Sequence, residues 1–201
     1  MPSNTDALVL NLPIIVLPTG GYLSTPPLDL HATDFTIATK VNLNSTANRN
    51  IILGNWSNNQ NAWQLLFAIN GGGAPAITLR KDLPTNGSQP NQDLLGLVGT
   101  LKVTAGQFNH VAVTFSWGKN YMTPTATLYV NGKVAGTVSP TISPDEPGVQ
   151  NPYTLKRSSN AYLIGRKEDS NGASDGVFAG QFSDFRIYTA ALTDAEIGTL
   201  L

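Results

Sequence analysis

The clearest pattern of apolar and polar positions lies between residues 106 and 138. Every second position in the first part of this stretch is apolar and would share one face: Val111, Val113, Phe115 and Trp117. Such period-two alternation predicts a β-strand with one buried face. A second alternating run, residues 126–130, ends at Asn131-Gly132, and both residues of this pair tolerate the positive φ of a tight turn. Residues 133–138 are therefore predicted to return as a third antiparallel strand.

Short strands are predicted along the rest of the chain, separated by segments rich in Gly, Pro and Asn. Their expected ranges are 8–17, 22–25, 35–42, 51–53, 63–69, 76–80, 94–101, 161–165 and 177–188. Pro13 lacks a backbone donor, so the first of these is expected at a sheet edge or bulge. The sequence Thr193-Asp-Ala-Glu196 is a capping box, which predicts a short helix from Thr193 to about Leu200. A sheet with one apolar face needs a second apolar layer.

Several runs resemble the signature of laminin-G-like, or concanavalin A-like, jelly-roll domains. They are Phe35–Ile37, Gln107–Phe115, Leu128–Gly132, Tyr162–Gly165, Gly180–Tyr188 and Ala191–Ile197. The likeness spans roughly residues 20–200. It implies an all-β fold, a two-sheet antiparallel jelly-roll β-sandwich with a short C-terminal helix, formed as a single domain by residues 1–201. The family contains lectins, adhesion modules and accessory domains of enzymes, so the fold by itself does not give a function.

The composition argues against some classes of binding partner. The net charge is −1 and no basic tract is present, which argues against binding to nucleic acid or to an anionic membrane surface. The apolar run Leu8–Leu17 is too short to span a bilayer, so no membrane insertion is expected. No Lys or Arg precedes this run, and Pro13 interrupts it, so it does not resemble a signal peptide. If the chain is complete, a cytoplasmic location or non-classical secretion is expected.

Catalytic patterns are weak. Glycosidases of the resembled fold carry paired carboxylates on one strand, whereas Glu146, Glu168 and Glu196 are isolated in this sequence. The chain has no cysteine nucleophile and only two histidines. His110 lies on the alternating strand and is expected to be structural. The prediction is therefore a protein that is not an enzyme.

A sugar site needs an aromatic ring to contact the apolar face of a pyranose and planar polar groups to bond its hydroxyls. Two expected loops offer both, and two further residues are candidates to join them. The candidates are Asn55, Trp56, Asn58, Asn59 and Asn61 in the first loop, Trp117, Asn120 and Tyr121 in the second, and Tyr153 and Arg166 elsewhere. Trp56 lies among polar residues and is predicted to be exposed. Trp117 continues a core face, so a core position is an equal alternative.

Calcium is the one cofactor considered, because it binds clustered carboxylate and amide oxygens on loops. Asp169, Asn171 and Asp175 form the best cluster. Asp184 matches a family position that lies near the ion in some relatives. The alternatives are ordinary turn chemistry for the cluster and, for Asp184, an ion pair with Arg186 or a lysine.

These observations favour a non-catalytic carbohydrate-binding protein, a lectin whose partners are glycans. One alternative is a protein-binding adhesion or assembly module, and another is a glycoside hydrolase or lyase of the same fold. A lectin gains avidity by oligomerising, and the apolar first strand is the expected interface of a homodimer.

Overall fold

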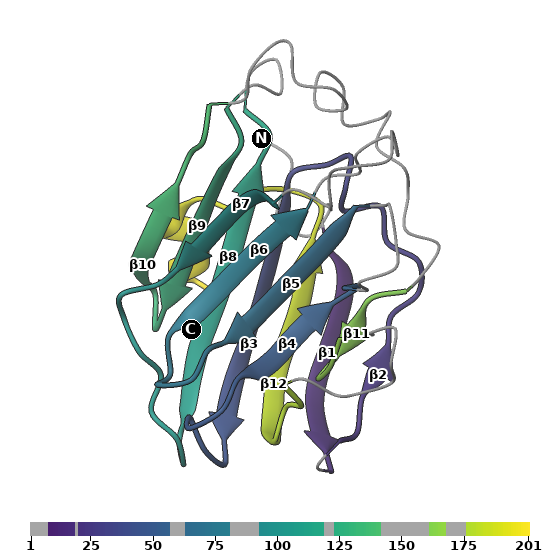
Figure 1. The fold of residues 1–201 in the computed structure, drawn as a ribbon, viewed down its shortest axis with the longest axis vertical. Coiled ribbons are helices and arrows are strands. Elements are labelled where there is room, and N and C mark those ends of the chain that lie inside the picture. The colour runs from purple at the N-terminus through teal and green to yellow at the C-terminus, as the bar shows by residue number, and fades with distance from the viewer. Residues whose placement is uncertain are drawn as a thin grey trace, which may run out of the picture.

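The computed structural model describes residues 8–18, 20–56, 63–80, 93–118, 123–141, 161–167 and 176–201. Within these ranges the chain forms twelve strands and one short helix. The strands make two antiparallel sheets of six strands each, which lie face to face as two layers (Figure 1). The all-β sandwich implied by the resemblance to concanavalin A-like jelly-roll domains is confirmed.

The first sheet contains strands from both ends of the sequence and from its central part. Its order is β1 (Leu8–Leu17), β12 (Gly180–Tyr188), β3 (Phe35–Leu43), β8 (Phe108–Ser116), β9 (Thr125–Val130) and β10 (Lys133–Val138). The predicted three-stranded unit is present as β8, β9 and β10. Its tight turn has positive φ at both Asn131 (48°) and Gly132 (73°), as the Asn-Gly pair predicts.

The second sheet contains the strands between these segments. Its order is β2 (Leu23–Ser24), β11 (Leu163–Ile164), β4 (Asn50–Gly54), β5 (Gln64–Ile69), β6 (Pro75–Arg80) and β7 (Asp93–Val98). The strands β4 to β7 form a meander in sequence order, because each pairs with the next. This sheet carries the candidate site described below.

The core between the sheets is rich in aromatic side chains. Phe35 and Phe115 stack with ring centroids 5.1 Å apart, and Trp117 meets Phe115 edge to face at 5.1 Å. A second group surrounds Phe182, which stacks on Phe178 at 3.7 Å and meets Phe185 edge to face. All six are nearly or fully buried, so much of the apolar area that holds the two layers together comes from aromatic rings.

The first strand lies at an edge of the first sheet, as Pro13 predicts. Ile15 and Leu17 point into the core, whereas Ile14 and Val16 remain 72% and 66% exposed. Two apolar side chains are therefore exposed on the edge strand of this sheet. The homodimer expected here stays a prediction.

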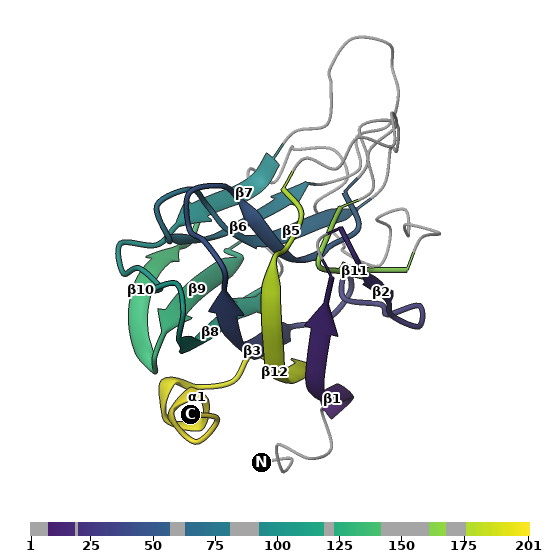
Figure 2. The ribbon, with the colours of Figure 1, turned by 90° about the horizontal axis from the view of Figure 1, so that it is seen from below.

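The helix α1 (Asp194–Gly198) begins with the predicted capping box between Thr193 and Glu196. It lies on the side of the first sheet that faces away from the second sheet (Figure 2). Its buried residue Ile197 packs with Tyr129, Tyr188 and Leu192 in a small separate cluster. Among the described residues, no helix has the length and apolar character needed to cross a bilayer.

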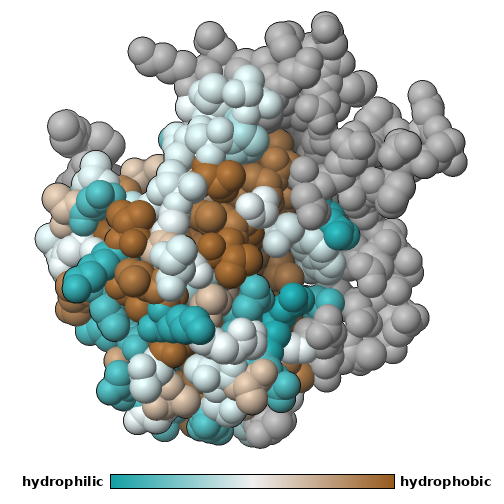
Figure 3. Space-filling view, turned by 60° about the vertical axis from the view of Figure 1, so that its left-hand side comes forward, coloured by the Kyte–Doolittle hydropathy of each residue, from teal (hydrophilic) through white to brown (hydrophobic). Residues whose placement is uncertain are grey.

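At one side of the sandwich β7 and β10, the end strands of the two sheets, lie beside each other and are in contact. Apolar side chains gather on this side of the molecule (Figure 3). Val98 and Val134 are 57% and 46% exposed there, and Leu97 and Val138 are partly buried against the core. We call these four residues the apolar edge. Its β7 members also border the hollow described next.

Candidate functional site

A hollow lies on the outer face of the second sheet, over β5, β6 and β7. In these strands Phe67, Ile77 and Leu95 point into the core. Successive residues of a strand point to opposite faces, so the intervening residues form the outer face. Several of these are small, and they are neighbours across the strands: Ala68 pairs with Ala76, and Thr78 pairs with Gly96. Small side chains at adjacent positions leave a depression between larger ones.

The hollow has a volume of about 370 Å³. That is at the lower end of the range for small-ligand sites, ~300–1,000 Å³. Its lining combines apolar, hydroxyl, amide and cationic groups: Arg49, Trp56, Leu66, Ala68, Asn70, Ala76, Thr78, Arg80, Gly96, Leu97, Val98 and Lys167. We call this site the Trp56 hollow.

Trp56 is the sequence-predicted residue that the structure places in the hollow, but its predicted exposure is wrong. Its side chain is only 7% exposed and packs with Ile51, Leu66 and Ala68. The guanidinium carbon of Arg80 lies 3.8 Å from the centroid of the ring, a cation–π contact. The Trp56 ring therefore lines the hollow and contacts Arg80. It does not present an exposed face on which a sugar ring could stack.

Asn55 is also buried, at 2% exposed, and its amide bonds the backbone of the neighbouring strand. Its Nδ2 donates to the carbonyl of Trp63 at 3.1 Å, and its Oδ1 accepts from the N–H of Leu65 at 2.6 Å. This corrects the prediction that the Asn55 side chain contacts a glycan. Both the amide nitrogen and the amide oxygen already form hydrogen bonds with the protein backbone. Asn55 clamps the end of β4 to the start of β5 and thereby fixes the backbone that precedes Trp56.

Replacing Asn55 with Leu is expected to lower the free energy of unfolding by about 2 kcal/mol, because two buried backbone groups lose their partners. Denaturant unfolding measures the change. The exposed Asn11 offers a control, because Asn11→Ala should change stability by less than about 0.5 kcal/mol. Equal stability of N55L and the unmodified protein would contradict the assigned role.

Trp117 occupies a core position, which was one of the two alternatives that the sequence left open. It is 2% exposed and contacts Trp63 and Phe115 in the aromatic group between the sheets. Its backbone N–H donates to Asp34 at 2.8 Å. A ring enclosed in this way does not reach a ligand, so the prediction of sugar contact by Trp117 is wrong.

Arg166 lies just after β11, and its guanidinium carbon is 4.2 Å from the ring centroid of Tyr22. It does not line the Trp56 hollow, whereas its neighbour Lys167 does. Nine other predicted site residues lie outside the described residues: Asn58, Asn59, Asn61, Asn120, Tyr121, Tyr153, Asp169, Asn171 and Asp175. Their proposed roles in sugar or calcium binding stay predictions.

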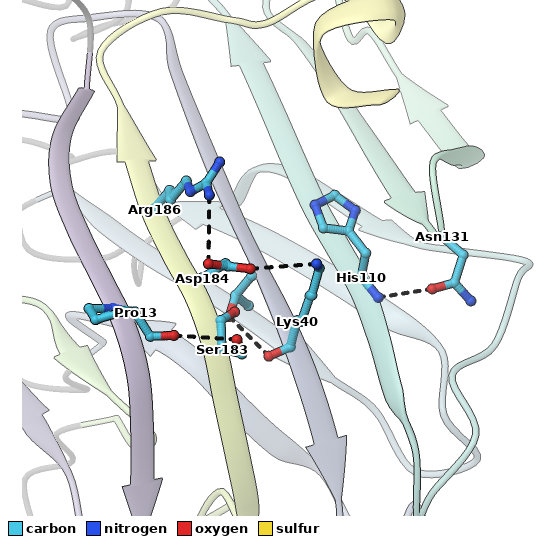
Figure 4. Close-up of polar contacts among 8 residues, drawn as sticks. Pro13, Lys40, His110, Asn131, Ser183, Asp184 and Arg186 are labelled. Carbon is cyan, nitrogen blue, oxygen red and sulfur yellow. Dashed lines mark hydrogen bonds and ion pairs between the residues drawn. The ribbon is translucent and has the colours of Figure 1, made fainter. Parts of the chain in front are cut away.

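Asp184 forms ion pairs on the outer face of the first sheet. Its carboxylate lies 3.5 Å from the Lys40 ammonium and 3.6 Å from the Arg186 guanidinium (Figure 4). Two adjacent cations disfavour a divalent metal ion at this carboxylate. Among the described residues, no three His, Asp or Glu side chains converge on a possible metal position. The arrangement is the ion-pair alternative that the sequence left open.

His110 lies beside this cluster and is 5% exposed. Its backbone N–H donates to the Asn131 side chain, while neither ring nitrogen has a hydrogen-bond partner among the described residues. Burial lowers the pKa of His110 from 6.5 to about 4, with further lowering by the charges of Lys40 and Arg186 and an opposing effect of Asp184. The ring is thus neutral at ordinary pH, as a structural histidine would be.

Most residues of the Trp56 hollow were not singled out in the sequence. Ala76–Arg80 was recognised as a strand, but its outer face was not distinguished from its core face. Two features of the sequence point to the hollow. Small residues occupy positions that become cross-strand neighbours in β5, β6 and β7, and Arg80 stands at the end of its strand. Arg49 and Lys167 carry no local signal, because they join the hollow only through the packing of distant segments.

A family model described as the concanavalin A-like lectin/glucanases superfamily matches residues 17–198 of this chain. No curated protein matches the sequence significantly. Solved structures with the same fold include the CBM40 module of the Ruminococcus gnavus IT-sialidase bound to α2,3-sialyllactose. That module is 16% identical, with a TM-score of 0.68 over 96% of this chain and 98% of the module.

Two further structures share the fold. The leech intramolecular trans-sialidase is 20% identical with a TM-score of 0.65, and the match covers 96% of this chain but only 28% of the enzyme. The SAP-like pentraxin of Limulus polyphemus is 16% identical with a TM-score of 0.54, covering 96% of this chain and 73% of the pentraxin. At these identities the likeness establishes a shared architecture.

Proposed function

This chain belongs to the concanavalin A-like lectin/glucanase superfamily, and we propose that it is a non-catalytic carbohydrate-binding protein whose glycan site is the Trp56 hollow. Carbohydrate binding is plausible from the fold alone, because modules of similar structure bind glycans. The observation that carries the proposal is the mixed lining of the hollow. The outer face of β5, β6 and β7 holds apolar, amide, hydroxyl and guanidinium groups within one depression.

A sugar ring presents C–H groups on one face and hydroxyls around its rim. The small and apolar side chains Ala68, Ala76 and Val98 suit the first, and Asn70 and Thr78 suit the second. The described lining contains no Asp, Glu or His. These side chains thus supply contacts for binding, without the pair of carboxylates that glycoside hydrolysis uses.

The sharpest test fills the hollow without removing any native contact. Gly96 lines it, and a Cβ built on Gly96 meets no atom within 4 Å. We expect Gly96→Trp to weaken glycan binding about tenfold or more, because a large side chain would occupy the depression. Gly96→Ala is the matched control, since a methyl group leaves the hollow open and binding should change little.

The measurement is a glycan array with the purified protein, followed by titration of the best ligand against both variants. Running the array with Ca²⁺ and again with EDTA tests the calcium hypothesis for Asp169, Asn171 and Asp175. Glycan binding that survives G96W would contradict the hollow as the site. The absence of any glycan ligand, with a protein partner recovered instead, would favour the adhesion-module alternative, for which the exposed Val98 and Val134 of the apolar edge offer a surface.

A further inference from the structure

We propose that the Trp56 hollow binds glycans that carry an alkyl or acyl chain, with the sugar over β5 and β6 and the chain directed across β7. The inference rests on the proposed function and adds the class of ligand. Polar residues line one side of the hollow and apolar residues line the other. An exposed apolar surface lies on the same side of the molecule as the apolar part of the lining (Figure 3).

The polar and apolar parts of the lining come from different strands of the second sheet. Arg49 precedes β4, Asn70 follows β5, and Thr78 lies on β6. The β7 strand contributes residues 96–98, which are a glycine, a leucine and a valine. Because the strand order is β4-β5-β6-β7, these apolar residues lie at the opposite side of the hollow from Arg49. A ligand with one polar end and one apolar end matches this arrangement.

One row of cross-strand neighbours on the outer face is apolar from β5 to β7. Ala68 pairs with Ala76, and Ala76 pairs with Val98. The two alanines are largely buried, whereas Val98 is 57% exposed at the end of the row. Neighbouring strands lie ~4.8 Å apart, so the row is about 10 Å long. A hydrocarbon chain laid along this row would have apolar atoms beneath it from β5 to β7, whereas the hydroxyls of a sugar would find no polar partner in these three side chains.

The rim of the hollow is low on the β7 side. Gly96 has no side chain, and a Cβ built there meets no atom within 4 Å. Beyond β7, the strand β10 also presents a glycine. A Cβ on Gly136 would lie 3.4 Å from Cδ1 of Leu97 and 3.8 Å from the carbonyl oxygen of Val98, so β10 approaches β7 closely at a position without a side chain. A chain that leaves the hollow over Val98 therefore continues onto the apolar edge, where Leu97 and Val138 pack against the core.

An amphiphilic glycan uses both parts of the lining at once. Its hydroxyls suit Asn70 and Thr78, and its chain covers the exposed Val98. Each CH₂ group removed from water strengthens binding by about fourfold. Burial of only two or three such groups would therefore raise the affinity more than about tenfold. The volume of about 370 Å³ suits one sugar residue with the start of its chain, while the rest of the chain lies on the surface.

The experiment compares ligands that differ only in the chain. Binding of the methyl and octyl β-glycosides of glucose, galactose and N-acetylglucosamine is measured by calorimetry, below the concentrations at which the octyl compounds form micelles. We expect at least one octyl glycoside to bind about tenfold or more tighter than the methyl glycoside of the same sugar. Val98→Asn should reduce that preference at least about threefold, because an amide replaces apolar contact with the chain. Val9→Asn is the matched control, since Val9 is a valine on β1 that is 42% exposed, and it should leave the preference unchanged.

Alkyl and acyl chains occur both in soluble glycosides and in the glycolipids of a bilayer. Flotation with phosphatidylcholine vesicles separates these sources. Recovery of the protein with vesicles that contain galactosylceramide, but not with plain vesicles, would identify a glycolipid as the ligand. Octyl glycoside binding without recovery on either kind of vesicle would identify a soluble glycoside. Equal recovery on both kinds would overturn the inference, because no sugar would be needed.

Equal affinity for methyl and octyl glycosides, with binding still blocked by G96W, would overturn the chain preference and leave the proposed function intact. A preference that V98N leaves unchanged would also overturn it, because the chain would then lie elsewhere. So would binding of octyl tetraethylene glycol ether, which has the chain but no sugar, as tightly as the octyl glycosides. If neither these glycosides nor any glycan on the array binds, the proposed function itself fails.

Discussion

Gly180→Ala is expected to lower the free energy of unfolding by at least about 3 kcal/mol. Gly180 begins β12 and pairs with Leu17 on one side and Leu43 on the other. A Cβ at this position would overlap the carbonyl oxygen of Asn42, which is backbone and cannot rotate away. The φ of 152° is also unfavourable for any residue with a side chain. The substitution therefore pushes the start of β12 away from the end of β3.

Equilibrium unfolding in urea would measure the loss, with Gly198→Ala as the matched control. Gly198 lies at the end of α1, and a Cβ there meets no atom within 4 Å. Because Ala has a higher helix propensity than Gly, G198A should be neutral or slightly stabilising. If G180A unfolds at the same urea concentration as G198A, the assigned backbone contact is wrong.

The second large effect is a loss of stability in acid that depends on His110. Its pKa is about 4 in the folded protein, against 6.5 when the chain is unfolded. The unfolded chain therefore binds the additional proton between these values, and stability falls as the pH is lowered from about 6.5 toward 4. A pKa difference of this size corresponds to about 3 kcal/mol of folding stability. This contribution is fully present at pH values above the pKa of His110 in the unfolded chain.

The test compares the unmodified protein with His110→Gln in urea at about pH 7.5 and about pH 4. The variant should lose about 3 kcal/mol less over this range, because Gln takes up no proton. NMR titration of the imidazole gives a second reading that does not need a variant. Lys40→Gln should raise the native pKa, since Lys40 is one of the charges that lowers it. A native midpoint near 6.5, or parallel stability losses in both proteins, would exclude the effect.

The sequence was sufficient for the architecture because strand formation is read from local alternation. The run from Val111 to Trp117 has the period of a strand with one buried face, and the structure confirms β8 there. The Asn131-Gly132 turn, the edge position of Pro13 and the capping box at Thr193 follow from the backbone chemistry of single residues or short motifs.

The candidate site was predicted much less well, and Trp56 shows why. A tryptophan among polar neighbours in sequence was predicted to be exposed, yet it is covered by Leu66 from β5 and Arg80 from β6. Asn55 likewise seemed to be a loop amide, and it is instead a clamp on the β5 backbone. Burial depends on which strands pair, and no window of local sequence contains that pairing.

By itself, then, the sequence determined the strands and their turns, because these depend on the spacing of apolar residues and on backbone preferences. The two-layer sandwich followed from the resemblance of these strands to a known family. Only the tertiary structure decided which groups share a surface. Arg49, Arg80 and Lys167 are separated by dozens of residues and meet because β4, β5 and β6 pair in order beside β11. A binding site depends on side chains brought together by long-range strand pairing, and that information is distributed over the whole chain rather than carried by any one motif.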